Sequence, residues 1–207
     1  MTLTKKSKRI VLVCAAVLLA ALLIVGIYGG AVLYIRKIGI PLSPGKDYPV
    51  REITYYLQGD PEWGSDGIGD SSTTMAAAGC LISCVASSMT EMGVETTPGE
   101  LNEALTGVDG FEGDILLWYK LNEAYPEIDY SHSRIFSSGT IQRDLEAGKL
   151  PIVKVYYKGG GVQHWLLVLG AENGEFMVMD PMNAELEPIP LSTHGKVYAY
   201  RVLEYAD

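Results

Sequence analysis

An uncharged run of 26 residues, from Ile10 to Ile35, is the first marked pattern along the chain. Basic residues border it on both sides: Lys5, Lys6, Lys8 and Arg9 before it, and Arg36 and Lys37 after it. The hydrocarbon core of a bilayer is about 30 Å thick and is crossed by a helix of about 20 apolar residues. The run is therefore long enough to form one transmembrane helix with some tilt.

The basic residues around this run also predict its orientation. Four precede it and two follow it, and the more basic side normally stays in the cytoplasm. We therefore expect residues 1–9 to be a cytoplasmic N-terminus, residues 10–35 to be a signal-anchor in the cell membrane, and the rest of the chain to lie outside. The alternative is a signal peptide cleaved near Gly29-Gly30-Ala31, which would leave a secreted protein.

The pattern changes after residue 35. Three prolines and two glycines predict a short linker over residues 36–49, and residues 50–207 form the predicted globular domain. Its pattern predicts a strand over residues 50–57, then a loop that runs into a helix over 74–92, then three further helices over 97–105, 115–124 and 140–147. Four strands follow, over 150–157, 164–169, 175–179 and 197–203. Helices that precede antiparallel strands indicate an α+β fold with the N-terminal helices packed on the sheet.

The charge of the chain is distributed unevenly. The formal net charge is −9, yet six of the 16 basic residues precede residue 38 and all 25 acidic residues follow it, which leaves −15 on the remainder. Such a domain is not expected to bind nucleic acid. It should also be repelled by an anionic membrane or wall polymer within a Debye length.

The cysteines predict thiol chemistry rather than a disulfide. Cys14 lies inside the apolar run, and Cys80 and Cys84 lie one turn apart on a predicted helix. Their Cβ atoms would point the same way, a poor geometry for a disulfide. We expect both to be free thiols, with Cys84 a small buried residue.

Three residues carry the candidate chemistry. Cys80 follows Gly79 at the start of a predicted helix, where the pKa of a thiol falls, and falls further beside an imidazolium. His164 begins an apolar strand, and Asp180 ends the next strand. The favoured hairpin turn Asn173-Gly174 would bring these two to the same end of the ribbon. This is the chain order of a papain-like cysteine hydrolase.

Alternatives remain open for each of these residues. Cys80 could be a buried structural cysteine, and His164 could be satisfied by a backbone carbonyl. Asp180 could simply form the turn before a proline, with Asn183 as the orienting residue instead. The other two histidines, His132 and His194, are expected on the solvated surface.

The sequence predicts no metal and no cofactor. The loop over residues 58–72 contains several carboxylates, but no alignment of it fits the calcium loop of an EF-hand. No close pair of cysteine or histidine residues has the spacing of zinc ligands. A phosphate-binding glycine-rich motif is also missing from the sequence.

Four separated motifs resemble a known family. They are Tyr56-Leu57-Gln58-Gly59-Asp60-Pro61-Glu62-Trp63, Gly79-Cys80, His164-Trp165 and Asp180-Pro181. In this order they resemble the bacteriocin-processing, double-glycine-type peptidases of bacteria. They are most similar to the stand-alone peptidase-like branch of cysteine peptidase family thirty-nine, which has a papain-like fold. The resemblance covers about residues 50 to 207.

The resemblance implies a role for each of four residues. Cys80 would be the nucleophile, His164 the general base, Asp180 the residue that orients the imidazole, and Gln58 the donor to the oxyanion. Gln58 precedes Cys80 by 22 residues, as in the stand-alone branch, whereas transporter-linked members have a shorter separation. The sequence also contains no ATP-binding segment. Processing of double-glycine leaders is therefore not carried over.

These observations predict a membrane-anchored extracytoplasmic cysteine peptidase that acts on a peptide or protein. A cell-wall peptide amidase or transpeptidase is one alternative. A non-catalytic module that binds peptides on the same fold is the other. The sequence does not indicate an oligomeric state.

Overall fold

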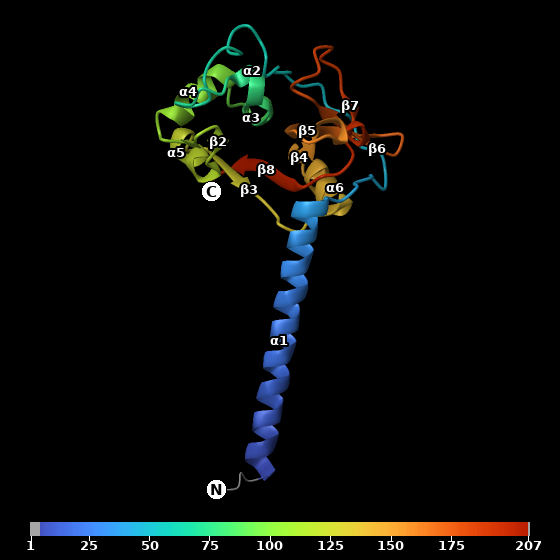
Figure 1. Cartoon of the computed structure of the whole chain (residues 1–207). Coiled ribbons are helices and arrows are strands. Elements are labelled where there is room, and N and C mark those ends of the chain that lie inside the picture. Colours follow the sequence, from blue (N-terminus) through green and yellow to red (C-terminus); the bar gives the residue numbers. More distant parts are fainter. Residues whose placement is uncertain (1–4, 207) are drawn as a thin grey trace.

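A computed structural model describes residues 5–206 of the chain, so residues 1–4 of the expected cytoplasmic segment lie outside the described residues. Helix α1, Lys5–Ile38, projects away from the rest of the molecule (Figure 1). Its apolar side chains are largely exposed. Within the described chain it is the one helix that is long and apolar enough to cross a membrane, over Arg9–Ile38, and it is compatible with a single-pass protein.

The segment after α1 is attached to the domain instead of forming a free linker. Ile40 pairs with Val197, and Tyr48 pairs with Ala171, through isolated β-bridges. The side chain of Leu42 is buried between these two points. Residues 36–49 therefore differ from the expected linker, because their apolar side chains fill one of the two hydrophobic cores.

The domain is built on one antiparallel sheet of six strands in the order β3-β8-β4-β5-β6-β7. The strands are β3 Ile128–Ser131, β4 Pro151–Tyr156, β5 Gln163–Glu172, β6 Glu175–Met179, β7 Ile189–Pro190 and β8 Ala199–Tyr205. β5 and β6 form the predicted hairpin, and Asn173 and Gly174 both have positive φ, 53° and 80°. These are the backbone angles that the favoured two-residue turn requires.

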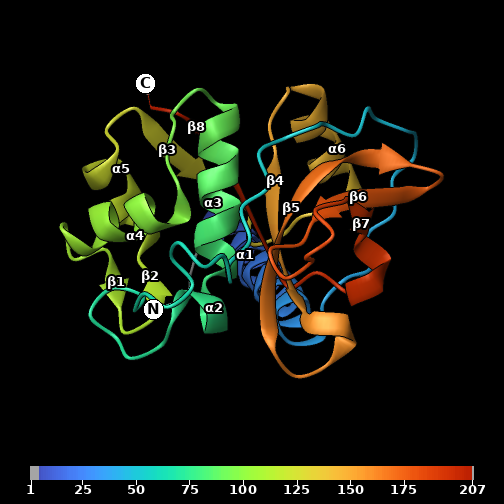
Figure 2. The same ribbon diagram turned by 90° about the horizontal axis from the view of Figure 1, so that it is seen from above.

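Short helices cover both faces of the sheet. They are α2 Met75–Ala78, α3 Cys80–Glu91, α4 Pro98–Thr106, α5 Leu121–Ala124 and α6 Ser138–Glu146, with 3-10 turns η1 Trp118–Lys120, η2 Tyr157–Gly159 and η3 Leu191–His194. A small hairpin joins β1 Phe111–Glu112 to β2 Ile115–Leu116. Figure 2 shows α2 to α5 gathered on one side of the molecule and α6, β6 and β7 on the other.

Side chains alternate between two cores, as the pleat of a strand requires. Leu167 of β5 packs in the core beneath α3 and α4. Its neighbours Leu166 and Val168 point to the core on the opposite face, with α6. The fold is α+β with N-terminal helices packed on an antiparallel sheet, which confirms the predicted fold class.

Two predicted elements differ from the structure. No strand forms over residues 50–57, where the Arg51 N–H donates to the Leu169 carbonyl and the chain otherwise runs as irregular backbone. β5 is already paired with β4 and β6, so this segment attaches only at single points. The predicted helix over 115–124 begins instead as β2 and η1, and only its last turn, α5, is α-helical.

Candidate active site

The break between α2 and α3 determines where Cys80 lies. Gly79 separates the two helices, and a Cβ atom there would approach the Met75 carbonyl oxygen to 2.6 Å. Any side chain at position 79 would therefore force the backbone to shift. Cys80 is the first residue of α3, as predicted, and is buried, with its Sγ 4.0 Å from the Ala78 carbonyl oxygen.

The electrostatics of Cys80 differ from the sequence expectation. Burial raises the pKa of the thiol to about 11, against the opposing effect of hydrogen bonding to the backbone of Trp165 and Leu81. We expected a lowered pKa from the helix N-terminus and an imidazolium. The raised pKa follows from loss of solvation, because burial disfavours the charged thiolate.

Cys84 lies one turn further along α3. Its Sγ donates to the Trp165 carbonyl at 3.5 Å, and its side chain is fully buried. Both Cys80 and Cys84 are free thiols. The backbone of Trp165, the residue that follows His164 in the sequence, thus contacts α3.

His164 and Asp180 form a short buried contact. His164 Nε2 lies 2.6 Å from Asp180 Oδ1, and the two residues are 2% and 3% exposed. The β5–β6 register pairs Leu167 with Met179, and an irregularity between Val168 and Gly170 takes up the unequal arm lengths. The hairpin therefore brings the two residues together at one end of the ribbon, as predicted.

Asp180 accepts further hydrogen bonds that hold its charge. The Met182 N–H donates to Oδ1 at 2.8 Å. Burial alone would raise the pKa of Asp180, but the hydrogen bond from His164 and the close approach of His194 outweigh it and hold the pKa well below its usual range. The alternative orienting residue, Asn183, donates instead to the Glu187 carbonyl.

His194 is part of this cluster, so its expected place on the solvated surface was wrong. It is 1% exposed, and its Nε2 lies 3.3 Å from Asp180 Oδ2, a close contact rather than a well-formed hydrogen bond. The Lys158 N–H donates to its Nδ1 at 3.1 Å. In the neutral ring the proton therefore sits on Nε2, facing the carboxylate.

Gln58 lies on the other side of the candidate site. Its Nε2 donates to the Ala76 carbonyl at 2.7 Å, and its buried Oε1 has no hydrogen-bond partner among residues 5–206. A cavity of about 260 Å³ adjoins it. The cavity is lined by Leu57, Gln58, Gly59, Ala76, Pro181, Met182 and Ala184.

The four predicted site residues are thus only partly joined. His164 and Asp180 are in direct contact, and the charge of Asp180 is close enough to raise the pKa of Cys80. Over the described chain, no hydrogen bond or ion pair connects Cys80 with His164. The Cys80 thiol lies against the backbone of Trp165, the residue after His164, and among the described residues it has no hydrogen bond to the imidazole ring.

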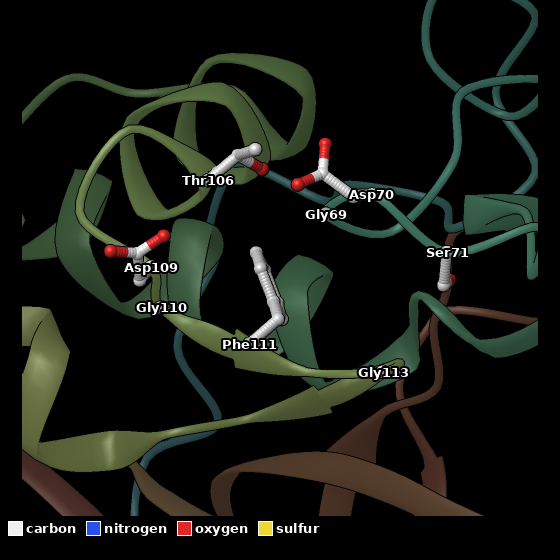
Figure 3. Close-up of a pocket in the computed structure, with 8 residues that line it drawn as sticks. All are labelled: Gly69, Asp70, Ser71, Thr106, Asp109, Gly110, Phe111 and Gly113. Carbon is white, nitrogen blue, oxygen red and sulfur yellow. The ribbon is translucent and has the colours of Figure 1, made fainter.

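A separate cavity of about 190 Å³ lies in the helical half of the domain and contains none of the four residues. Figure 3 shows its two carboxylates, Asp70 and Asp109, on different loops around Phe111. Within residues 5–206, no three His, Cys, Asp or Glu side chains converge as metal ligands would.

Comparison with known proteins identifies the fold. No protein-family model and no curated protein matches the chain. The crystal structure of a protein described as a C39-like peptidase from Bacillus anthracis is similar to it, with a TM-score of 0.53 and 10% identity, covering 78% of this chain and 98% of that one. The peptidase domain of Streptococcus ComA, a bifunctional ABC transporter involved in a quorum-sensing pathway, has a TM-score of 0.45 and 16% identity, covering 62% and 91%. The similarity to the Bacillus anthracis protein shows a C39 peptidase-like fold, as the motifs predicted.

Proposed function

We propose that the chain is a membrane-anchored, extracytoplasmic cysteine peptidase with Cys80 as nucleophile. His164 acts as general base, Asp180 orients it, and Gln58 contributes to the oxyanion hole. The observation that carries the proposal is the buried 2.6 Å contact between His164 and Asp180, next to a cysteine that begins a helix. The C39 peptidase-like fold supports the same assignment.

The contact with Asp180 prepares His164 to accept a proton. The ionised carboxylate accepts a hydrogen bond from the Nε2–H group, so the neutral ring keeps a lone pair on Nδ1. This lone pair is available for the proton of Cys80. Because burial raises the pKa of the thiol, the resting cysteine is neutral and its proton moves to His164 as attack begins.

The first half of the reaction forms an acyl-enzyme. Sγ of Cys80 bonds to the carbonyl carbon of the substrate, and the carbonyl electron pair moves onto the oxygen. The amide of Gln58 and the first N–H groups of α3 stabilise this oxyanion. The C–N bond then breaks, and the amine leaves with the proton held by His164.

The second half releases the acyl group. A water molecule gives a proton to His164 and attacks the thioester carbon. The C–S bond breaks, a carboxylic acid is formed, and the sulfur of Cys80 regains a proton from His164. No metal or cofactor takes part in this scheme.

The location outside the cytoplasm rests on α1 and its flanking charges. The helix is long enough to cross a membrane, and its N-terminal side is the more basic. The cleft beside Gln58 would then open on the outer side, where a peptide or protein is the substrate.

One observation favours a second candidate, a non-catalytic module that binds peptides. Cys80 is buried, has a raised pKa, and forms no bond to His164 among the described residues. A binding module would have no need of a reactive thiol. The two proposals differ in whether substrate makes the thiol react.

The test uses the full-length chain in detergent and a mixed peptide library read by mass spectrometry. We expect cleavage by the wild type and by Cys84→Ala, and at least a thousandfold slower cleavage by Cys80→Ala. Cys84→Ala is the matched control, since Cys84 is a buried thiol on the same helix. Equal cleavage by Cys80→Ala would contradict the peptidase. Peptide binding without any cleavage by the wild type would establish the binding module.

A further inference from the structure

A cavity of about 550 Å³ lies where α1 meets the domain, and we call it the basic pocket. Its lining includes Val32, Arg36, Arg134, Lys154, Trp165 and Arg201. Four of these six are basic, and the whole lining contains no Asp or Glu. This concentration of positive charge stands out on a domain whose acidic residues greatly outnumber its basic ones.

The cations of the basic pocket have no acidic partners. Among residues 5–206, none of the four lies within ion-pair distance of a carboxylate. Lys154 reaches only the Gln163 side chain, at 3.4 Å. Burial, together with nearby Arg36 and Arg201, lowers the pKa of Lys154. An anion in the pocket would relieve this repulsion.

Arg201 is the most constrained of these side chains. Its Nη1 donates to the neighbouring Tyr200 carbonyl at 2.7 Å, and its guanidinium lies 5.6 Å from the centre of the Trp118 ring. Its Nε is buried and has no hydrogen-bond partner in the described chain. A buried donor without an acceptor is unfavourable, so this atom marks a place for a ligand oxygen.

The sheet register explains why these charges gather. Lys154 of β4 lies opposite Trp165 of β5 and Ala199 of β8, in the middle of the sheet. The positions two residues away on the same face, such as Ile152 and Leu203, are fully apolar core beneath α3. Beyond the end of this core the same face carries Lys154 and Arg201. Charged side chains on the central strands of a sheet are rarely found without a partner that neutralises or hydrogen-bonds them.

The position of α1 indicates the depth of the basic pocket. The apolar run of 26 residues is about 39 Å long as a helix. The hydrocarbon core is about 30 Å thick, and the bilayer with its headgroups about 40–45 Å. If the run begins at the inner edge of the core, its last six residues enter the outer headgroup layer. Val32 and Arg36, which line the pocket, then lie at the level of the lipid phosphates.

We infer that the basic pocket binds the phosphate of an anionic phospholipid headgroup on the outer face of the membrane. The inference rests on the proposed anchoring by α1. A phosphodiester supplies oxygens for Lys154, Arg134 and the orphan Nε of Arg201. Bound there, the lipid offsets the repulsion expected between the acidic domain and the membrane and fixes the domain against the bilayer.

The test is a lipid titration of the full-length chain in micelles of an uncharged maltoside detergent. Soluble dihexanoyl phosphatidylglycerol is added, and tryptophan fluorescence is followed because Trp165 lines the pocket. Dihexanoyl phosphatidylcholine, inorganic phosphate and an oligoglutamate peptide are titrated in parallel. We expect saturable binding of phosphatidylglycerol, with an apparent Kd at least tenfold lower than for any of the other three.

Variants locate the binding. Lys154→Gln/Arg134→Gln should raise the apparent Kd at least tenfold. The matched control Lys46→Gln/Arg143→Gln, which removes the same charge from exposed residues outside the pocket, should leave it within twofold. If the first pair impairs folding, Arg134→Gln alone, at an exposed position, should raise the apparent Kd about threefold.

Several results would overturn the inference. Equal affinity for phosphatidylcholine or for inorganic phosphate would exclude a specific headgroup, and tighter binding of oligoglutamate would make the pocket a peptide subsite. Unchanged binding in the double variant would place the lipid elsewhere. The intact mass of the protein extracted from membranes is also measured. A mass that lacks α1 would show that the anchoring has failed, and not the lipid site. Peptide cleavage is measured separately and does not enter these results.

Discussion

Asp180 lies between the imidazole rings of His164 and His194, and each ring faces a different oxygen of its carboxylate. Asp180 Oδ1 contacts His164 at 2.6 Å, while Oδ2 faces His194 at 3.3 Å. His194 is in turn held by the Lys158 N–H. A carboxylate held at both oxygens has little freedom to rotate. We therefore interpret His194 as a positioning residue for the proposed general base.

Substitution of His194 tests this role. We expect His194→Ala to lower kcat about tenfold with little change in KM, because the carboxylate loses one support but keeps its contact with His164. His194→Gln should recover part of the loss, since its amide can donate to the same oxygen. The measurement is kcat and KM for both variants, with the pH profile of kcat. Equal losses in the two variants, with an unaltered pH profile, would indicate a purely structural role.

The raised pKa of Cys80 predicts how the protein reacts with alkylating reagents in the absence of substrate. Burial favours the neutral thiol, so without substrate the rate of iodoacetamide alkylation should keep rising above the ordinary thiol pKa of about 8.5 and level off near pH 11. Cys84→Ala removes the second external thiol and isolates the signal. A plateau already reached near neutral pH would show a preformed thiolate and contradict the resting state described above.

Gly79 links the residue scale to the elements, because it ends α2 and allows α3 to begin at Cys80. A Cβ atom at this position would lie 2.6 Å from the Met75 carbonyl oxygen, so the two helices could not keep their present junction. We expect Gly79→Ala to lower the free energy of unfolding by about 2 kcal/mol and to reduce the rate of peptide cleavage as well. Gly45→Ala is the control, since a Cβ atom there meets only a flexible glutamine side chain at 3.6 Å. The measurement is denaturant unfolding, and equal stability of both variants would refute the argument.

The elements that local sequence specifies were predicted well. β6 has the predicted bounds, Glu175–Met179, because apolar residues follow a strong turn signal at Asn173-Gly174. α4 begins as expected for the helix predicted over 97–105, because Thr97 and Glu100 bond reciprocally in a capping box. Both signals act over a few residues, so the sequence alone specifies them.

Elements that depend on distant partners were not predicted. Residues 50–57 have the composition of a strand, but whether a strand forms depends on a free sheet edge, and β5 offers almost none. His194 was missed for a related reason. It lies in the short turn η3, and the return of the chain after β7 brings it to Asp180, which no local pattern indicates.

The candidate site residues and the contacts between them were not equally predictable from the sequence. The sequence order indicated Cys80, His164, Asp180 and Gln58, and the hairpin geometry correctly brought His164 to Asp180. The relation of Cys80 to His164 depends on how α3 packs on β5, and the thiol lies against the backbone of Trp165. Sequence spacing carries no information on that packing.

At the scale of the whole molecule, charge and shape give the domain two different sides. Acidic residues outnumber basic ones in the domain as a whole, whereas the basic pocket lies where α1 joins the domain. Figure 2, which looks down on the domain, shows α1 beneath the line where the helical half meets the sheet. This strongly basic cavity is therefore directed towards the proposed membrane.

The last prediction concerns α1, on which both the anchoring and the lipid site depend. Leu19→Lys/Leu22→Lys would bring two charges into the middle of the bilayer, at about 2.5–3.5 kcal/mol each, and we expect the chain to lose retention in the membrane fraction. Leu101→Ala is a control for general destabilisation, because Leu101 is fully buried in the core of the domain and lies outside α1. It should unfold more easily but stay with the membrane. Wild-type protein found in the soluble fraction with a shortened mass would instead show that α1 is removed. This result would refute the anchor. It would not affect the proposed cleavage reaction, which is tested separately.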